Sequence, residues 1–222
     1  MAVQTHNHHH AVKHHPHTVT PTYLRGIDVS HWDGTVDWSK VKAAGNTFAF
    51  AKATDGKRHV DHTFSTNWAS MKAAGLVRGA YHFGHPKQDA VAQAKHFYDV
   101  VKPSHGDLQL VLDLEVSDGQ RNAAVWTWAQ AFMAEIQRLS GRPAIFYSYG
   151  PFWTHHMGNP SDNKNCPLWL ADYRHKPHVP HAWTNWTFWQ YTSKGKVAGV
   201  HTHVDENYFR GNLAELNQLT FP

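Results

Sequence analysis

The chain has very little cysteine and no long apolar run. Cys166 is the single cysteine among 222 residues, so an intrachain disulfide is excluded and the thiol is expected to pack rather than react. No uninterrupted apolar stretch approaches the roughly 18 residues of a membrane-spanning helix. Hydrophobic residues still make up 41% of the sequence, which is enough for a sizeable core. The sequence therefore predicts a protein that folds around a core and does not partner a membrane.

The charge and the aromatic content of the chain indicate which kinds of molecule it could bind. Lys and Arg number 21 against 17 Asp and Glu, a surplus too small to define a nucleic-acid-binding stripe. The basic balance, with a pI of about 9.1, suits an anionic surface such as a cell wall. Ten Trp and eight Tyr offer aromatic faces of the kind that stack on sugar rings, although many will be core.

Residues 1–22 differ from the rest of the chain. They hold seven of the 21 histidines and almost no large apolar residue, which predicts a disordered His-rich arm. Weak metal binding and pH-dependent charging near an anionic surface are the functional interpretations of such an arm. The stretch has no apolar segment of the kind that a secretory signal carries, so we expect no signal peptide in this sequence.

Short strand-like runs recur from residue 24 onward. They cover residues 24–31, 47–54, 76–83, 108–116, 143–149, 167–173, 186–192 and 203–209. Helix-like segments at 37–45, 64–75, 89–102 and 122–141 separate the first five, with Gly45, Gly75 and Gly141 as helix stops. This alternation predicts an α/β fold: an irregular TIM-like barrel of about five βα units followed by three strands with few helices. No break divides residues 23–222, so we expect one catalytic domain there.

Acidic residues lie in or near the ends of these strands. Asp28, Asp113 with Glu115, and Asp205 belong to different strand-like runs. Reactive groups of such barrels gather at the carboxyl ends of the strands. Residues i and i+2 of a strand point to the same face, so Asp113 and Glu115 are expected to face the mouth together, about 6.5 Å apart along the strand. Two close carboxyls acquire unequal pKa values, the arrangement that glycosidic cleavage uses. A structural acid pair in salt bridges is the alternative interpretation.

Eight motifs resemble glycoside hydrolase family 25, the N-acetylmuramidase lysozymes. They are "GIDVSHWDGTVDW", "FAFAKATDG", "AAGLVRGAYHFG", "LVLDLE", "IFYSY", "LWLADY", "FWQYT" and "VDENYF", which span about residues 24–210 in the family's order. The resemblance implies cleavage of the β-1,4 bond between N-acetylmuramic acid and N-acetylglucosamine in peptidoglycan, without metal or organic cofactor. It also implies action outside the cell, after secretion or phage lysis, and we default to a monomer that binds no nucleic acid.

The resemblance also implies roles for particular residues. Glu115 corresponds to the general acid/base, and Asp113 to the carboxylate that stabilises the reacting centre. Asp28 and Asp205 correspond to supporting acids. The resemblance implies that Tyr81, Tyr147, Trp189 and Gln190 bind substrate. Lys52, Asp172 and Tyr173 are added to the expected substrate-binding residues because they lie near strand ends.

Some features depart from the family or leave a choice open. "ATDG" at 53–56 replaces a more usual "ATEG", the loop 174–186 is rich in His and Trp, and we expect no C-terminal wall-binding module. Asp113 has two possible roles, covalent attack or orientation of the substrate's own acetamido group, and we favour the second. A weakly catalytic sugar-binding barrel, a chitinase-like enzyme and a His-rich metal-binding protein are the rival functions. His82 and His31 are expected to be packed, hydrogen-bonded residues.

Overall fold

The computed structural model describes residues 23–222, so the predicted N-terminal arm lies outside the described residues. Its strands are β1 (Leu24–Val29), β2 (Phe48–Asp55), β3 (His59–Val60), β4 (Val77–Phe83), β5 (Val111–Asp113), β6 (Ile145–Tyr149), β7 (Leu168–Ala171), β8 (Phe188–Gly195) and β9 (Val204–Phe209). Its helices are a short 3-10 turn, η1 (His31–Asp33), followed by α1 (Trp38–Ala43), α2 (Phe64–Ala73), α3 (Ala90–Val101), α4 (Asn122–Ser140), α5 (Gly150–His155) and α6 (Leu213–Asn217).

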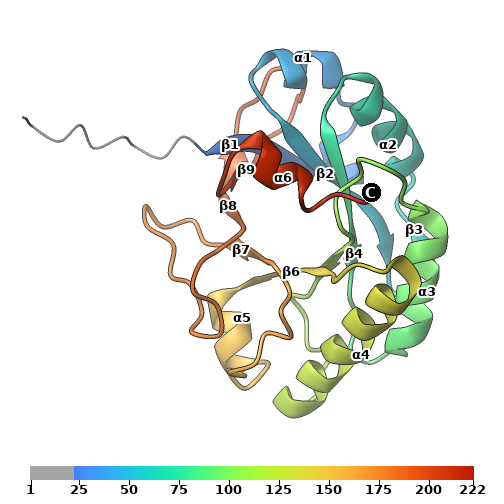
Figure 1. Cartoon of the computed structure of the whole chain (residues 1–222), viewed down its shortest axis with the longest axis vertical. Coiled ribbons are helices and arrows are strands. Elements are labelled where there is room, and N and C mark those ends of the chain that lie inside the picture. The colour runs from blue at the N-terminus through green and yellow to red at the C-terminus, as the bar shows by residue number, and fades with distance from the viewer. Residues whose placement is uncertain (1–22) are drawn as a thin grey trace, which may run out of the picture.

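Eight strands close into a barrel, in the order β1-β9-β8-β7-β6-β5-β4-β2, with β2 pairing back to β1. The short strand β3 pairs with Thr54 and Asp55 at the end of β2 and was not predicted. Helices α1 to α4 cover one side of the barrel, whereas long loops and the short α5 cover the side of β7 and β8 (Figure 1). The predicted irregular α/β barrel is confirmed.

The last strand runs against its neighbours. β9 is antiparallel to both β8 and β1, whereas β1, β2 and β4 to β8 are mutually parallel. The alternation of strands and helices predicted a parallel sheet, but β8 and β9 are joined by a short hairpin loop with no crossover helix. Such a loop forces an antiparallel pair. As a result, β9 begins at the mouth of the barrel where the parallel strands end.

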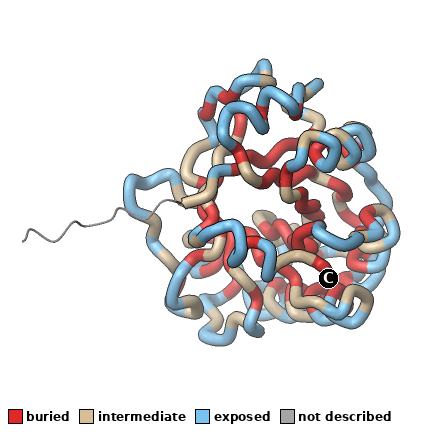
Figure 2. The backbone as a smooth tube through the Cα atoms, turned by 45° about the horizontal axis from the view of Figure 1, so that its top comes forward, coloured by how far each residue is buried: buried red, intermediate tan, exposed pale blue. Residues whose placement is uncertain are grey.

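Side-chain alternation separates two cores. Phe48 and Phe50 point into the barrel, whereas Ala49 and Ala51 face the helices. Gly26 makes room for the interior rings, because a Cβ there would lie 2.5 Å from Phe48 Cε2. Figure 2 shows this arrangement as buried strands within a shell of exposed helix faces and loops.

The far end of the barrel is closed by the C-terminal segment. Leu216 of α6 packs into the interior core, and Leu108 pairs with Thr220 in an isolated bridge. The interior is therefore filled at one end and open at the other. The open end is the one where β1 and β5 finish.

Candidate active site

Four acids meet at the mouth of the barrel. Asp28, Asp113, Glu115 and Asp205 line one small cavity of about 70 Å³, together with Tyr81, Tyr147 and Trp169. Asp205 reaches this place because β9 is antiparallel, which puts it opposite Asp28 in the register of the β1–β9 pair. The predicted convergence of the four acids is what the structure shows. Glu115 lies two residues beyond Asp113, where β5 has already ended.

The Asp113 and Glu115 carboxyls are close enough to share a proton. Burial raises the pKa of Asp113 well above its usual range, and the charge of Glu115 raises it further. Burial also raises the pKa of Glu115, while a hydrogen bond from Asp113 and the charge of Lys52 lower it in part. Asp113 Oδ1 makes no hydrogen bond within the described residues. Burial and mutual repulsion therefore both favour a pair that keeps a proton over a doubly ionised one.

Asp28 and Asp205 form a second carboxyl pair. Burial and the charge of Asp205 raise the pKa of Asp28 well above its usual range. Burial, with the charge of Asp33, raises the pKa of Asp205 to about 6. Asp28 Oδ2 accepts hydrogen bonds from Gln190 Nε2 at 2.9 Å and Asn207 Nδ2 at 2.7 Å. Asp28 is therefore fixed by two amides while Asp205 lies nearer the solvent.

Gln190 links the acids to the tyrosines. Its Oε1 accepts from the hydroxyls of Tyr147 at 3.0 Å and Tyr173 at 2.8 Å, while its amide nitrogen donates to Asp28. Only 1% of Gln190 is exposed, so it lies behind the wall of the cavity instead of on it. Both polar atoms of the amide already make hydrogen bonds within the protein, so the expected contact of Gln190 with substrate stays a prediction.

A larger hollow of about 410 Å³ continues from the acid cavity. Glu115 and Tyr147 line both spaces, which makes them the junction. The larger hollow is otherwise lined by Tyr149, Gly150, Pro151, Ala171, Asp172, Tyr173 and Arg174. Tyr173 is 57% exposed and presents its ring on this wall. The two spaces form one groove with the acids at its deep end, and we call it the acid groove.

Lys52 lies behind the acid groove, whereas Asp172 lines it. Lys52 Nζ lies 2.7 Å from Asp55 Oδ2 and 4.9 Å from the centre of the Phe83 ring. Its charge lowers the pKa of both Asp113 and Glu115, although Lys52 is not among the lining residues. Asp172 does line the larger hollow, but its carboxylate accepts from Arg174 and from the backbone of His178. Hydrogen bonds to Arg174 and His178 lower its pKa against the effect of burial.

Trp189 is not brought to the groove. It packs on the outer side of the sheet against Trp186 and Tyr208, and its Nε1 donates to the backbone oxygen of Asp172 at 2.6 Å. Trp189 and Gln190 are adjacent in β8, so only one of them can face the barrel interior. Trp189 and Gln190 therefore cannot both line one wall of the groove, and Trp189 is the one that faces outward.

Two interior residues of the site, Trp169 and Asn207, were not predicted from the sequence. Trp169 lines the acid cavity and donates to Asn207 Oδ1 at 2.7 Å, and Asn207 in turn donates to Asp28. Asn207 lies two positions after Asp205, so the same-face rule applied to Asp113 and Glu115 would have found it. His82, in contrast, is the predicted core residue: it is fully buried between Thr54 and Gln93.

No cluster of three or more metal-ligating side chains occurs within residues 23–222. In the same range, no helix combines the length and apolar character needed to span a bilayer.

Comparisons with known proteins show which family the chain belongs to. The family model "Glycosyl hydrolases family 25" matches residues 27–200. Lysozyme M1 of Streptomyces globisporus is 37% identical over 208 residues, covering 88% of this chain and 71% of that protein. The N,O-diacetylmuramidase of Chalaropsis sp is 32% identical over 165 residues, covering 67% and 77%.

Solved structures show the same likeness in three dimensions. The bacterial lysozyme from Streptomyces coelicolor superposes with a TM-score of 0.86 at 35% identity, covering 90% of this chain and 98% of that one. The family GH25 lysozyme from Aspergillus fumigatus gives 0.84 at 29% identity, covering 90% and 100%. A barrel with carboxyls gathered at its mouth is here that of a glycoside hydrolase. The chain belongs to glycosyl hydrolase family 25, as its eight motifs indicated.

Proposed function

We propose that this enzyme hydrolyses the β-1,4 bond between N-acetylmuramic acid and N-acetylglucosamine in peptidoglycan, with net retention. Glu115 acts as the general acid/base and Asp113 as the stabiliser of the reacting centre. The observation that carries the proposal is the position of Glu115, which joins the two parts of the acid groove beside a more deeply buried carboxyl. A glycan lying along the groove would cross this junction.

Proton sharing between the two acids gives each its role. Burial raises the pKa of both carboxyls, and the charge of Glu115 raises that of Asp113 further, so the pair can carry one proton on Asp113 before the reaction. Transfer of that proton to Glu115 leaves Asp113 ionised, and Glu115 then protonates the glycosidic oxygen as the bond to the leaving sugar breaks. The positive charge that develops at the anomeric carbon is stabilised by the Asp113 anion. The pair thereby supplies an acid and an anion from a single proton.

Asp113 Oδ1 suits the substrate-assisted route. Asp113 lines the acid cavity, and its buried Oδ1 has no hydrogen-bond donor among the described residues. The N–H of a 2-acetamido group would satisfy it and be held so that the amide oxygen attacks the anomeric carbon. Water then opens the resulting ring with Glu115 as the base, which preserves the anomeric configuration.

The remaining groups bind or position the sugar. Tyr81 and Tyr147 line the cavity, and Tyr173 presents its ring on the wall of the larger hollow. Asp28 and Asp205 hold the floor, while Lys52 tunes the charge of the acid pair. The proposed chemistry uses these side chains and water, with no metal or organic cofactor. A monomer acting on the wall outside the cell, after secretion or phage lysis, fits this substrate.

The test is the Glu115→Gln variant on purified peptidoglycan, with Glu135→Gln as the matched control. Glu135 is paired with Arg138 on α4, outside the groove. Clearing of the suspension and new reducing ends are both measured. We expect wild type and the control to release muramic acid reducing ends, and Glu115→Gln to release none.

Three results would contradict parts of this proposal. New glucosamine ends, or none with wild type, would overturn the assigned bond. Comparable clearing by Glu115→Gln would overturn the general acid. A covalent sugar adduct trapped on Asp113 would overturn the substrate-assisted route alone.

A further inference from the structure

A second hollow opens beside the acid groove. It has a volume of about 360 Å³ and lies between α5 and the loop that joins β7 to β8. Gly150, Pro151 and Arg174 line both this hollow and the larger part of the acid groove, so the two spaces are continuous. We call the second space the histidine hollow. It is a side branch of the groove.

The lining of the histidine hollow is rich in cationic and N–H donor groups. Arg174, His155, His178 and His181 line it, and none of its described lining residues carries a carboxylate. All four side chains are exposed, so their nitrogens can reach a ligand. The segment 174–181, "RHKPHVPH", contains no acidic residue. Guanidinium and imidazole N–H groups are donors suited to carboxylate or phosphate oxygens.

The loop that carries these groups is held in shape from within. Asp172 accepts from Arg174 Nε at 2.8 Å and from the backbone N–H groups of Arg174 at 3.1 Å and His178 at 2.9 Å. Pro180 is buried under the loop. These contacts occupy the Asp172 carboxylate, so it does not compete for His155 and His181. An incoming anion would therefore meet a preformed surface.

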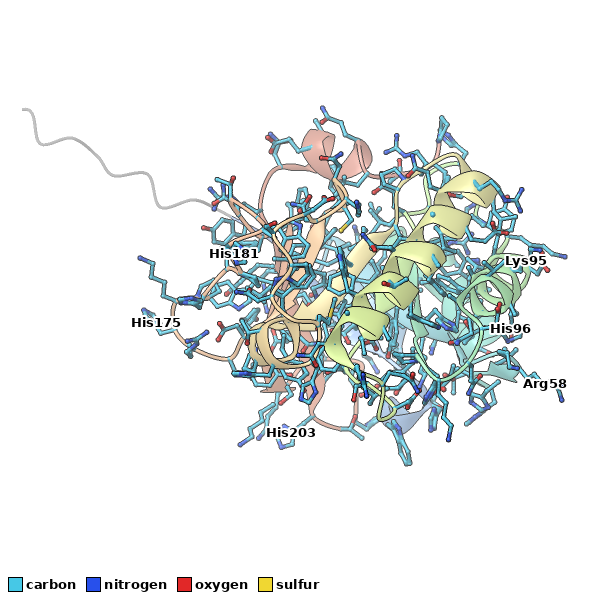
Figure 3. All side chains as sticks on the ribbon, turned by 90° about the horizontal axis from the view of Figure 1, so that it is seen from below. Arg58, Lys95, His96, His175, His181 and His203 are labelled. Carbon is cyan, nitrogen blue, oxygen red and sulfur yellow. The ribbon has the colours of Figure 1, made fainter. Side chains whose placement is uncertain are left out.

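The three imidazoles do not form a metal site within the described chain. Figure 3 shows His181 on the loop side of the molecule, away from His96 on α3. His155, His178 and His181 line the same side branch of the groove.

We propose that the histidine hollow is a subsite for the peptide stem of peptidoglycan, whose carboxylates bind His155 and His181. This inference rests on the proposed muramidase function. In peptidoglycan a peptide, the stem, extends from the lactyl group of muramic acid. A groove that binds the glycan must therefore leave space beside it for this peptide. The glycan backbone offers neutral hydroxyl and amide groups, whereas the stem carries free carboxylates. A side branch lined by cationic and N–H donor groups matches the stem.

Two soluble substrates separate this inference from the proposed function. One consists of glycan chains with uncross-linked stems, and the other of the same chains after an amidase has removed the stems. Both are first freed of phosphate-containing wall polymers, because phosphate shares the anionic chemistry of the stem. The double variant His155→Ala/His181→Ala is compared with wild type and with His96→Ala. His96 is a partly exposed histidine on α3, outside the hollow, and serves as the control.

We expect the double variant to lose about three- to tenfold in kcat/KM on stem-bearing chains, the scale of one or two charge-assisted hydrogen bonds at an exposed site. Activity on stem-free chains is expected to equal that of wild type, which also shows that the variant is folded. His96→Ala should match wild type on both substrates.

Equal ratios of the two kcat/KM values for the double variant and wild type would overturn the stem subsite while leaving the muramidase proposal intact. A defect seen only on walls that retain phosphate polymers would also overturn it, and would assign the hollow to those polymers. Absence of cleavage of both substrates by wild type would instead defeat the proposed function.

Discussion

Replacing Asp205 with asparagine is expected to stabilise the fold at neutral pH while lowering activity. Asp205 faces Asp28 across the β1–β9 pair, and burial together with Asp33 raises its pKa from 3.8 to about 6. In the unfolded chain the same carboxyl ionises near pH 4. At pH 7 the folded protein must therefore carry an ionised group in a site that prefers it neutral.

The sign and size of the effect follow from linkage. Between pH 4 and 6 the folded protein keeps a proton that the unfolded chain has lost, so stability falls as pH rises through this window. A shift of about two pKa units corresponds to about 3 kcal/mol, which solvent screening of this partly exposed group reduces to about 1–3 kcal/mol. Asparagine removes the charge and offers an N–H to Asp28. The variant should gain this amount at pH 7 and almost none at pH 3.5.

Urea denaturation at pH 3.5, 5, 6 and 7 measures the gain directly. Asp162→Asn is the control, because Asp162 is exposed and paired with Lys164, so its pKa is lowered instead of raised. That substitution should give no gain at any pH. An Asp205→Asn variant no more stable than wild type at pH 7, or equally stabilised at pH 3.5, would refute the reasoning about the carboxyl pair.

Three further predictions concern the network around the acids. Asp113→Asn should lower the rate of reducing-end release by about 10²- to 10⁴-fold with an unchanged circular dichroism spectrum, and retention of more than a tenth of the activity would contradict its role. Gln190→Met removes the amide between Asp28 and Tyr147, so we expect a loss of about 1–3 kcal/mol in unfolding free energy and a displaced pH–rate profile. An unchanged profile would make Gln190 purely structural. Burial lowers the pKa of His82 to about 3, so the unfolded chain alone binds a proton as pH falls below 6.5. The contribution of His82 to wild-type stability should therefore fall by about 2 kcal/mol between pH 6.5 and 5, opposite in sign to that of Asp205. The difference in unfolding free energy between wild type and His82→Gln should shift by this amount in favour of the variant over the same range in matched urea titrations.

The strands were predictable because their residues alternate or form short apolar runs bounded by glycine. Gly45 and Gly75 do adopt positive φ just beyond α1 and α2, as the sequence indicated. Strand β5 was predicted over 108–116 but spans Val111–Asp113, since regular pairing with β4 and β6 ends there. Propensity marks a segment as extended, but only its neighbours decide how much of it pairs.

The site was predictable at the acids and less so at their supports. The i,i+2 rule placed Asp113 and Glu115 on one face without knowledge of the barrel. It could not say which of Trp189 and Gln190 faces inward, because that depends on the register of β8 against β7 and β9. The i,i+2 rule also could not show that the Asp172 carboxylate forms an ion pair with Arg174, because that contact depends on how the loop folds. The sequence pattern predicts which face of a strand a side chain lies on, whereas tertiary contacts decide whether that side chain is free to bind a ligand.

The antiparallel course of β9 has a practical consequence. Leu24 at the start of β1 pairs with Phe209 at the end of β9, and the segment beyond α6 returns to pair near Leu108. Both ends of the described chain therefore emerge on the face opposite the acid groove. A tether, label or wall-targeting module attached at either end would leave the groove facing its substrate. The same geometry would let the enzyme be fixed to a solid support by either end without blocking access to an insoluble polymer.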